Sequence, residues 1–238
     1  MSVAGFNDKI QKMPKRINFR YYDLIIAAFA ASLLISNLSA TKLIGIGPII
    51  TDGGALLFPL VYILGDVLTE VYGYAYARRA IWVGFGIMAI AVFAFTIVRY
   101  APGADVYTDQ AAYEAVLGFF PRIVLASLLA YLVGSFINAY ILSWLKVKMA
   151  GKKLWVRLIG STFVGEFFDT LVFGLVAFGG ILGARDMIIF ILVGWLFKTA
   201  VEILLLPATY RVVGWLKKAE RHDHYDTGDN YSPFHISI

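Results

Sequence analysis

Six long apolar stretches, separated by short polar connections, constrain this chain more than any other feature. They cover approximately residues 22–43, 53–72, 80–100, 122–145, 158–182 and 187–213. About 20 apolar residues are needed for a helix to cross a bilayer, and each stretch is about that long. The chain has 60% hydrophobic and only 16% charged residues, where a soluble domain has about 25% charged residues. We therefore predict an all-α integral membrane protein with six transmembrane helices.

The basic residues predict the domain limits and the orientation. Residues 1–20 form a basic N-terminal arm, residues 21–216 a six-helix transmembrane domain, and residues 217–238 a polar tail that is expected to be mobile. Most of the 21 Lys and Arg residues fall in the arm, the second and fourth connections and the C-terminal end. The alternate connections hold Lys42, Arg99, Arg122 and Arg185. The positive-inside rule then places both termini in the cytoplasm of a multi-pass inner-membrane protein.

Two apolar stretches carry pairs of acidic residues. Asp66 and Glu70 lie four residues apart within residues 64–73, so one face of a continuous helix would present both. Glu166 and Asp169 lie similarly within residues 164–174. A charged side chain at mid-membrane costs about 2.5–3.5 kcal/mol on insertion scales, so intramembrane acids usually serve a function. We expect these four carboxylates to line a polar cavity for a small solute.

The positions of the acids also suggest an internal repeat. With six helices, the first three and the last three form antiparallel halves, and the second helix of each half carries the acids. Both acidic motifs directly follow a glycine, in Gly65-Asp66 and Gly165-Glu166. Two inverted three-helix halves would place the two acidic pairs opposite each other near the midplane, where many transporters bind their substrates.

Three motifs together resemble the queuosine precursor transporter family, also called the vitamin uptake transporter family. They are Ser36-Asn37, residues 64–73 and residues 160–170, and the resemblance extends over about residues 22–217. It implies a six-helix protein of the bacterial inner membrane that imports 7-deazaguanine bases. These are the 7-cyano and 7-aminomethyl precursors used to modify tRNA. Some similar proteins carry related deazapurines, so the resemblance leaves the preferred base open.

A 7-deazaguanine offers a ring N–H and an exocyclic amine side by side, and a carboxylate can accept both. Glu70 and Glu166 are the candidates for this contact, and neutralising either is expected to weaken binding. Asp66 and Asp169 would bind the 7-aminomethyl group or hold the first pair in place. The same acids are also compatible with structural pairing to nearby basic residues.

The remaining candidates are neutral or basic. Asn37 and Asn138 could donate to the base carbonyl or form interhelical hydrogen bonds. Trp195 could stack on the base or pack against lipid. Lys198 could contact the ligand or form an ion pair with Glu202, four residues later.

The sequence also restricts the other function classes. It contains no cysteine, and its three histidines, His222, His224 and His235, follow the last apolar stretch. We therefore expect no metal, no cofactor and no enzyme, although a hydrolase built on Asp66 and Asp169 is compatible with the residue types. The alternatives are a proton-coupled carrier of another solute and a substrate-binding subunit of a larger transport complex.

The expected partners are a small-molecule substrate and the lipid bilayer. The basic residues lie in short connections between apolar stretches, so no nucleic acid is expected. Small residues at Gly84/Gly86 and at Ala126/Ala130 could support a homodimer.

Overall fold

The computed structural model describes residues 19–39, 41–46, 49–117, 121–228 and 230–235. Most of the predicted basic arm lies outside these residues. The described elements are, in order, α2 (Tyr22–Ser39), β1 (Leu43–Ile46), β2 (Ile49–Asp52), η1 (Gly53–Leu56), α3 (Phe58–Val67), η2 (Leu68–Tyr72), α4 (Tyr74–Tyr100), α5 (Gln110–Leu117), α6 (Pro121–Lys148), α7 (Leu154–Phe178) and α8 (Ala184–Glu220).

Five helices, α2, α4, α6, α7 and α8, are long and apolar enough to cross a membrane by length and composition. The predicted membrane class is therefore confirmed, but the second predicted helix is not one of the five. It is divided into a 3₁₀ turn, the ten-residue α3 and the π-helical η2. Gly53, Gly54 and Pro59 stand at its beginning, where glycine and proline favour an irregular first turn.

A short β-hairpin departs from the all-α prediction. Strands β1 and β2 are antiparallel, with Leu43 opposite Asp52. The Gly53 N–H donates to the Lys42 carbonyl at 2.8 Å and closes the base of the hairpin. Isoleucines are frequent in this region, and their β-branched side chains favour extended strands. The six-helix prediction, which rested on apolar length, took no account of them.

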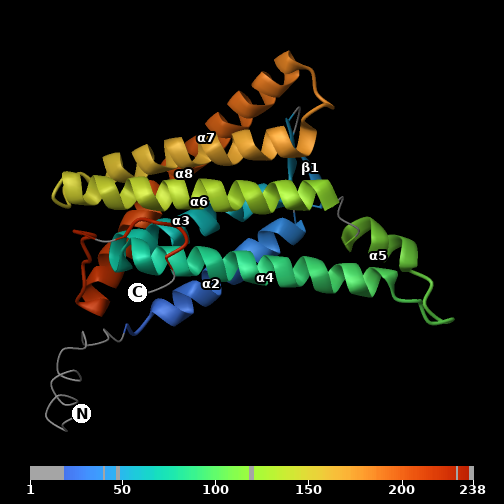
Figure 1. Ribbon diagram of the computed structural model, residues 1–238, viewed down its shortest axis with the longest axis horizontal. Helices are drawn as coiled ribbons and strands as arrows, with labels where there is room; N and C mark the ends of the chain where they lie inside the picture. Colours follow the sequence, from blue (N-terminus) through green and yellow to red (C-terminus); the bar gives the residue numbers. More distant parts are fainter. Residues whose placement is uncertain (1–18, 40, 47–48, 118–120, 229, 236–238) are drawn as a thin grey trace, which may run out of the picture.

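The bundle has two distinct ends (Figure 1). At one end, here called the hairpin end, lie β1, α5 and the connection between α7 and α8. At the other, the tail end, lie the connection between α6 and α7 and the C-terminal residues. Helices α6 and α7 pack along each other, α8 crosses α7 obliquely, and α3 contacts α2, α6 and α8. The short acid-bearing helix α3 is therefore surrounded by longer helices.

The C-terminal residues pack against the tail end. Residues 221–228 and 230–235, here called the strap, follow α8 and lie across α4, α6 and η2 (Figure 1). Asp226 accepts a hydrogen bond from the Tyr74 N–H at 2.9 Å. Arg78 and Trp82 donate to strap carbonyls at 2.7 and 2.8 Å. This differs from the mobile tail expected from its polar composition, because buried side chains of the bundle supply its hydrogen bonds.

The small residues considered for a dimer contact serve mainly within one chain. Ala126 and Ala130 are buried. A Cβ on Gly84 would meet Tyr131 at 2.8 Å, whereas Gly86 has nothing within 4 Å. Three of the four positions are thus already covered inside the chain. The homodimer itself stays a prediction.

Candidate functional site: a carboxylate-rich centre

A close crossing of α6 and α7 brings two of the predicted site residues together. A Cβ built on Gly134 would come within 2.7 Å of the Asp169 Cβ. A Cβ built on Gly165 would come within 2.8 Å of the Asn138 Cβ. Small residues allow helix backbones in membranes to approach this closely. The crossing therefore places Asn138 and Asp169 about one helical turn apart on two closely packed helices.

A group of charged residues between α7 and α8, here called the lysine cluster, consists of Glu166, Asp169 and Lys198. Lys198 Nζ lies 3.3 Å from Glu166 Oε2 and also pairs with Asp169. Glu166 is buried and interacts with Tyr62 of α3. The ion-pair partners of Lys198 thus lie on the neighbouring helix α7. The sequence had instead suggested Glu202, on the same helix as Lys198.

Trp195 lies beside the lysine cluster, one turn before Lys198. Its indole N–H donates to the Phe163 carbonyl at 2.8 Å, and its ring centroid is 4.4 Å from that of Phe163. It also packs edge-on against Phe167. The indole is therefore held in a fixed orientation by α7, and stacking on a base is compatible with this position.

Two further acids, Asp66 of α3 and Glu202 of α8, form what is here called the acid pair. Asn138 donates to Asp66 Oδ1 at 2.8 Å, and the Thr162 hydroxyl donates to Glu202 Oε1. Both carboxyl groups are buried and lie close enough to interact with each other. Glu202 was missed as a site residue. An acid within an apolar helix is a sign of a functional site. Here Lys198, four residues earlier, made Glu202 look like one half of a local ion pair.

Several polar atoms around the acid pair lack hydrogen-bond partners among the described residues. They are Asn138 Oδ1, the second carboxylate oxygen of Glu202 and the hydroxyl of Thr199. Buried polar atoms are normally satisfied, and each exception calls for an explanation. These atoms mark the centre as a place where a polar ligand, a proton or water would gain contacts.

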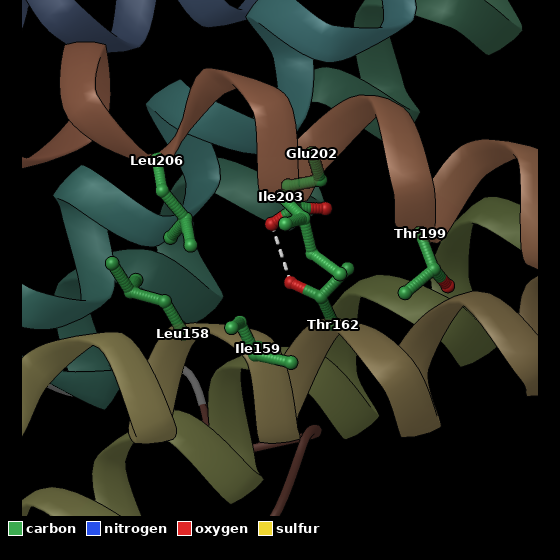
Figure 2. A pocket seen from close by; sticks show the side chains of 7 residues that line it. All are labelled: Leu158, Ile159, Thr162, Thr199, Glu202, Ile203 and Leu206. Carbon is green, nitrogen blue, oxygen red and sulfur yellow. Dashed lines mark hydrogen bonds between the residues drawn. The ribbon is translucent and has the colours of Figure 1, made fainter.

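A crevice between α7 and α8 reaches Glu202 of the acid pair (Figure 2). Thr162, Thr199 and Glu202 form its polar part, and Leu158 and Leu206 face each other at one side. The crevice has no room for even a water molecule, whereas typical ligand pockets enclose roughly 300–1,000 Å³. The structure therefore shows the centre in a closed arrangement.

Glu70 belongs to a separate group near the tail end, here called the tail-end ion cluster. Its carboxylate pairs with Arg157 through two hydrogen bonds and with Lys217 at 2.6 Å. Lys146 lies 3.7 Å from Glu70 Oε1 and bonds to Asp223 of the strap. Glu70, Arg157 and Lys146 are almost fully buried. The cluster therefore ties η2, α6, α7, α8 and the strap together.

Asp66 and Glu70 lie about one turn apart, Asp66 in α3 and Glu70 in the π-helical segment η2. Their carboxylates nevertheless have different partners. Asp66 accepts from Asn138, whereas Glu70 pairs with Arg157 and Lys217 of the tail-end ion cluster. Gly73, with φ of 91°, ends the segment in a conformation that favours glycine.

The strap contributes the charged groups of this region that lie outside the membrane-spanning helices. Burial alone would raise the pKa of Asp223, but hydrogen bonds from Lys146 and Lys217 outweigh it and hold that pKa below its usual value. Burial lowers the pKa of His222, and the nearby His224 and Lys146 lower it further. The strap is thus held with Asp223 charged and His222 neutral.

The structure accordingly divides the eight predicted site residues. Six lie in or beside the central clusters: Asp66, Asn138, Glu166, Asp169, Trp195 and Lys198. Glu70 lies in the tail-end ion cluster. Asn37 donates to the Leu33 carbonyl of its own helix at 2.9 Å. The described residues contain no group of three or more His, Cys, Asp or Glu side chains suited to a metal ion.

Comparison with known proteins decides the family. A family model described as "Putative vitamin uptake transporter" matches residues 52–212, which include α3, α6, α7 and most of α8. The chain belongs to this family. The match covers both central clusters and Glu70 and Arg157 of the tail-end ion cluster.

Curated relatives agree with the family. The chain is 32% identical over 187 residues to the "Probable queuosine precursor transporter" of Bacillus subtilis, covering 78% of this chain and 82% of that protein. It is 26% identical over 170 residues to the "Queuosine precursor transporter" of Escherichia coli, covering 68% and 72%. No solved structure matches the chain. Family and relatives are transporters and not enzymes, as the sequence predicted. The chain is a multi-pass membrane transporter.

Proposed function

We propose that this protein imports queuosine precursors, 7-cyano-7-deazaguanine and 7-aminomethyl-7-deazaguanine, across the bacterial inner membrane. The names of the relatives support the substrate class. In this proposal the tail end faces the cytoplasm, in line with its basic residues. The segment from η1 to η2 supplies the sixth crossing, with the hairpin completing its path. The bilayer and the base are then the partners, and no nucleic acid is involved.

The lysine cluster carries the proposal, because it places two carboxylates and an ammonium within the bundle beside an oriented indole. Glu166 would accept the ring N–H and exocyclic amine of the base as a bidentate acceptor. Lys198 would donate to the base carbonyl, and Trp195 would cover a face of the ring. Asp169 would bind the aminomethyl group. The lysine cluster has two carboxylates and one ammonium, so the positive charge of the aminomethyl group would balance the second carboxylate.

Entry of a base requires the helices to separate. The crevice beside the acid pair is too small for a ligand, and α7 and α8 close it from both sides (Figure 2). Movement of α8 away from α7 would enlarge it and expose Lys198. In the proposed cycle the three-helix units, α2 to α4 and α6 to α8, rock against each other, as in transporters with inverted repeats. The short α3 departs from such symmetry, since its counterpart α7 is a continuous helix.

Ligand-induced thermal stabilisation of the purified protein tests the proposal. Both precursors should raise the melting temperature, and guanine serves as the specificity control. Glu166→Gln should abolish the shift, because charge-assisted hydrogen bonds to the base contribute about 1.5–3 kcal/mol each. Glu114→Gln changes an exposed acid of α5 and should leave the shift intact. Absence of any shift with either precursor would refute the substrate assignment.

A further inference from the structure

The charges at the centre of the bundle are not balanced by side chains. Lys198 already serves both acids of the lysine cluster. The groups that contact the acid pair, the Asn138 amide and the Thr162 hydroxyl, are neutral donors. Within the described part of the chain, the cations of the tail-end ion cluster are engaged with Glu70 and Asp223. Among the described residues, the ion pairs involve neither Asp66 nor Glu202.

Two ionised carboxylates cannot stay adjacent in such a place without compensation. Their repulsion grows as the local dielectric constant falls, and each also loses its hydration. A proton shared between them removes one charge and supplies the hydrogen that a carboxyl–carboxylate contact needs. Carboxylate dyads in other proteins hold a proton for this reason.

From this geometry we propose that Asp66 and Glu202 form a proton-binding site that couples proton entry to import of the base. The inference rests on the proposed function. One carboxylate takes a proton from solution at the hairpin end and holds it while the centre is closed. The proton then leaves to solution at the tail end, so no other reactant is needed.

The neighbourhood of the acid pair favours a proton over a metal cation. The Asn138 amide N–H and the Thr162 hydroxyl donate hydrogen bonds to its carboxylates, and the described residues hold no group of three or more acids or histidines suited to a metal ion. The ionisable neighbours are Glu70 and Tyr62 on the α3–η2 side, Glu166 on α7 and Lys198 on α8. The unpartnered oxygen of Glu202 is a second, independent sign, since this residue is 94% buried and the crevice leads to it.

Coupling follows from the position of the pair. Glu202 lies one helical turn after Lys198, so the same segment of α8 carries a base-binding residue and a proton-binding residue. The Thr162–Glu202 hydrogen bond joins α7 to α8 across the crevice (Figure 2). An acid pair that holds a proton would let α7 and α8 close, whereas a pair with two ionised carboxylates would drive them apart.

The purified protein in liposomes tests the proposal with 7-cyano-7-deazaguanine, which is uncharged. The membrane potential is clamped with potassium and valinomycin. The gradient is made alkaline inside. One-to-one coupling then predicts about tenfold accumulation of the base for each pH unit, because a tenfold concentration ratio and a difference of one pH unit have the same free energy. A collapsed pH gradient should remove the accumulation, and a sodium gradient without a pH gradient should produce none. Accumulation driven by sodium would overturn the proposal.

Counterflow, the exchange of labelled base for unlabelled base without a gradient, separates this proposal from the proposed function. Absence of counterflow in the wild type would reject the base as substrate. Counterflow without any response to the pH gradient would reject the proton site alone.

Glu202→Gln should abolish gradient-driven accumulation and retain counterflow. Asp105→Asn, which changes an exposed acid in the connection before α5, is the matched control and should behave as wild type. Full accumulation by Glu202→Gln would overturn the assignment to this pair. If that variant does not fold, the wild-type gradient experiment still decides whether import is coupled to protons.

Discussion

Asp169 differs from the other central acids in its exposure. Its side chain is 15% exposed, whereas that of Glu166 is 2% exposed, although Lys198 contacts both. A more accessible carboxylate suits the flexible substituent of a base better than its ring edge. The residue therefore offers a way to distinguish the two precursors.

We expect Asp169→Asn to weaken binding of the aminomethyl precursor about 10- to 100-fold, since it removes a charge-assisted contact of about 1.5–3 kcal/mol. The cyano precursor has no ammonium group and should lose much less affinity. Calorimetric titration of both bases measures the difference, with Asp105→Asn as the control. Equal losses for the two bases would contradict the role given to Asp169.

Glu70 has a different role at the same scale. Glu70→Gln would leave the buried Arg157 without its counter-charge and would remove a carboxylate beside Lys146 and Lys217. Breaking a buried ion pair in this way typically costs about 3–5 kcal/mol. We expect a lower melting temperature in the absence of any base, measured in detergent, and Glu114→Gln as an exposed control should not change it.

The double variant Glu70→Gln/Arg157→Gln provides a sharper test of the same pair. Because the two residues interact directly, its loss of stability should be smaller than the sum of the two single losses. A loss of stability equal to the sum of the two single losses would show that the direct Glu70–Arg157 interaction contributes little to stability.

At the scale of elements, the α6–α7 crossing depends on two glycines. Gly134→Ala would place a methyl group against the Asp169 Cβ and the Gly165 carbonyl, at 2.7 and 3.2 Å. The helices would have to separate, and overpacking of this kind costs about 1–3 kcal/mol. We therefore expect lower thermal stability together with weaker base binding, because Asn138 and Asp169 both lie at the crossing.

Gly86→Ala is the matched control for this prediction. Gly86 also lies within a long helix but has nothing within 4 Å of an added Cβ. Alanine has the higher helix propensity, so this variant should be neutral or slightly more stable. Similar effects of the two substitutions would show that the crossing tolerates a larger residue.

The elements also show what the sequence could and could not predict. Hydrophobic length located α2, α4, α6, α7 and α8, whereas the short α5 (Gln110–Leu117) lies in the connection between the third and fourth apolar stretches. Asp66 and Glu70 have different partners because of tertiary packing, which residue types and spacing do not reveal. The resemblance pointed to the family that the comparisons show, whereas the tertiary partners of Lys198 and Glu202 required the structure.

The whole molecule is closed most firmly at the tail end. The tail-end ion cluster joins five elements, and the strap adds hydrogen bonds to α4. In the proposed import cycle the tail end opens to release the base, so these contacts would have to break or move. The strap would then act as a removable closure, and its attachment should respond to conditions that change its charge.

His222 gives this attachment a pH dependence with a definite sign. Its pKa is lowered from 6.5 because burial, His224 and Lys146 disfavour its charged form. A released strap would take up a proton more readily, so attachment weakens as pH falls through about 6.5 and levels off below the lowered pKa. Asp223 stays charged between pH 7.5 and 5.5, since its pKa lies below 3.8. Protonation of His224 would instead strengthen its pairing with Asp226, 3.3 Å away.

Hydrogen exchange of the strap amides measures this balance. We expect faster exchange at pH 5.5 than at pH 7.5, after correction for the intrinsic rate, in peptides covering residues 222–235. His222→Phe keeps an aromatic ring against Phe19, whose centroid is 4.9 Å from that of His222, and removes the titration. The variant should therefore lose the acceleration while keeping His224. Equal pH responses in the two proteins would show that His222 does not control the strap, and attachment would then depend on the ion pairs of Asp223.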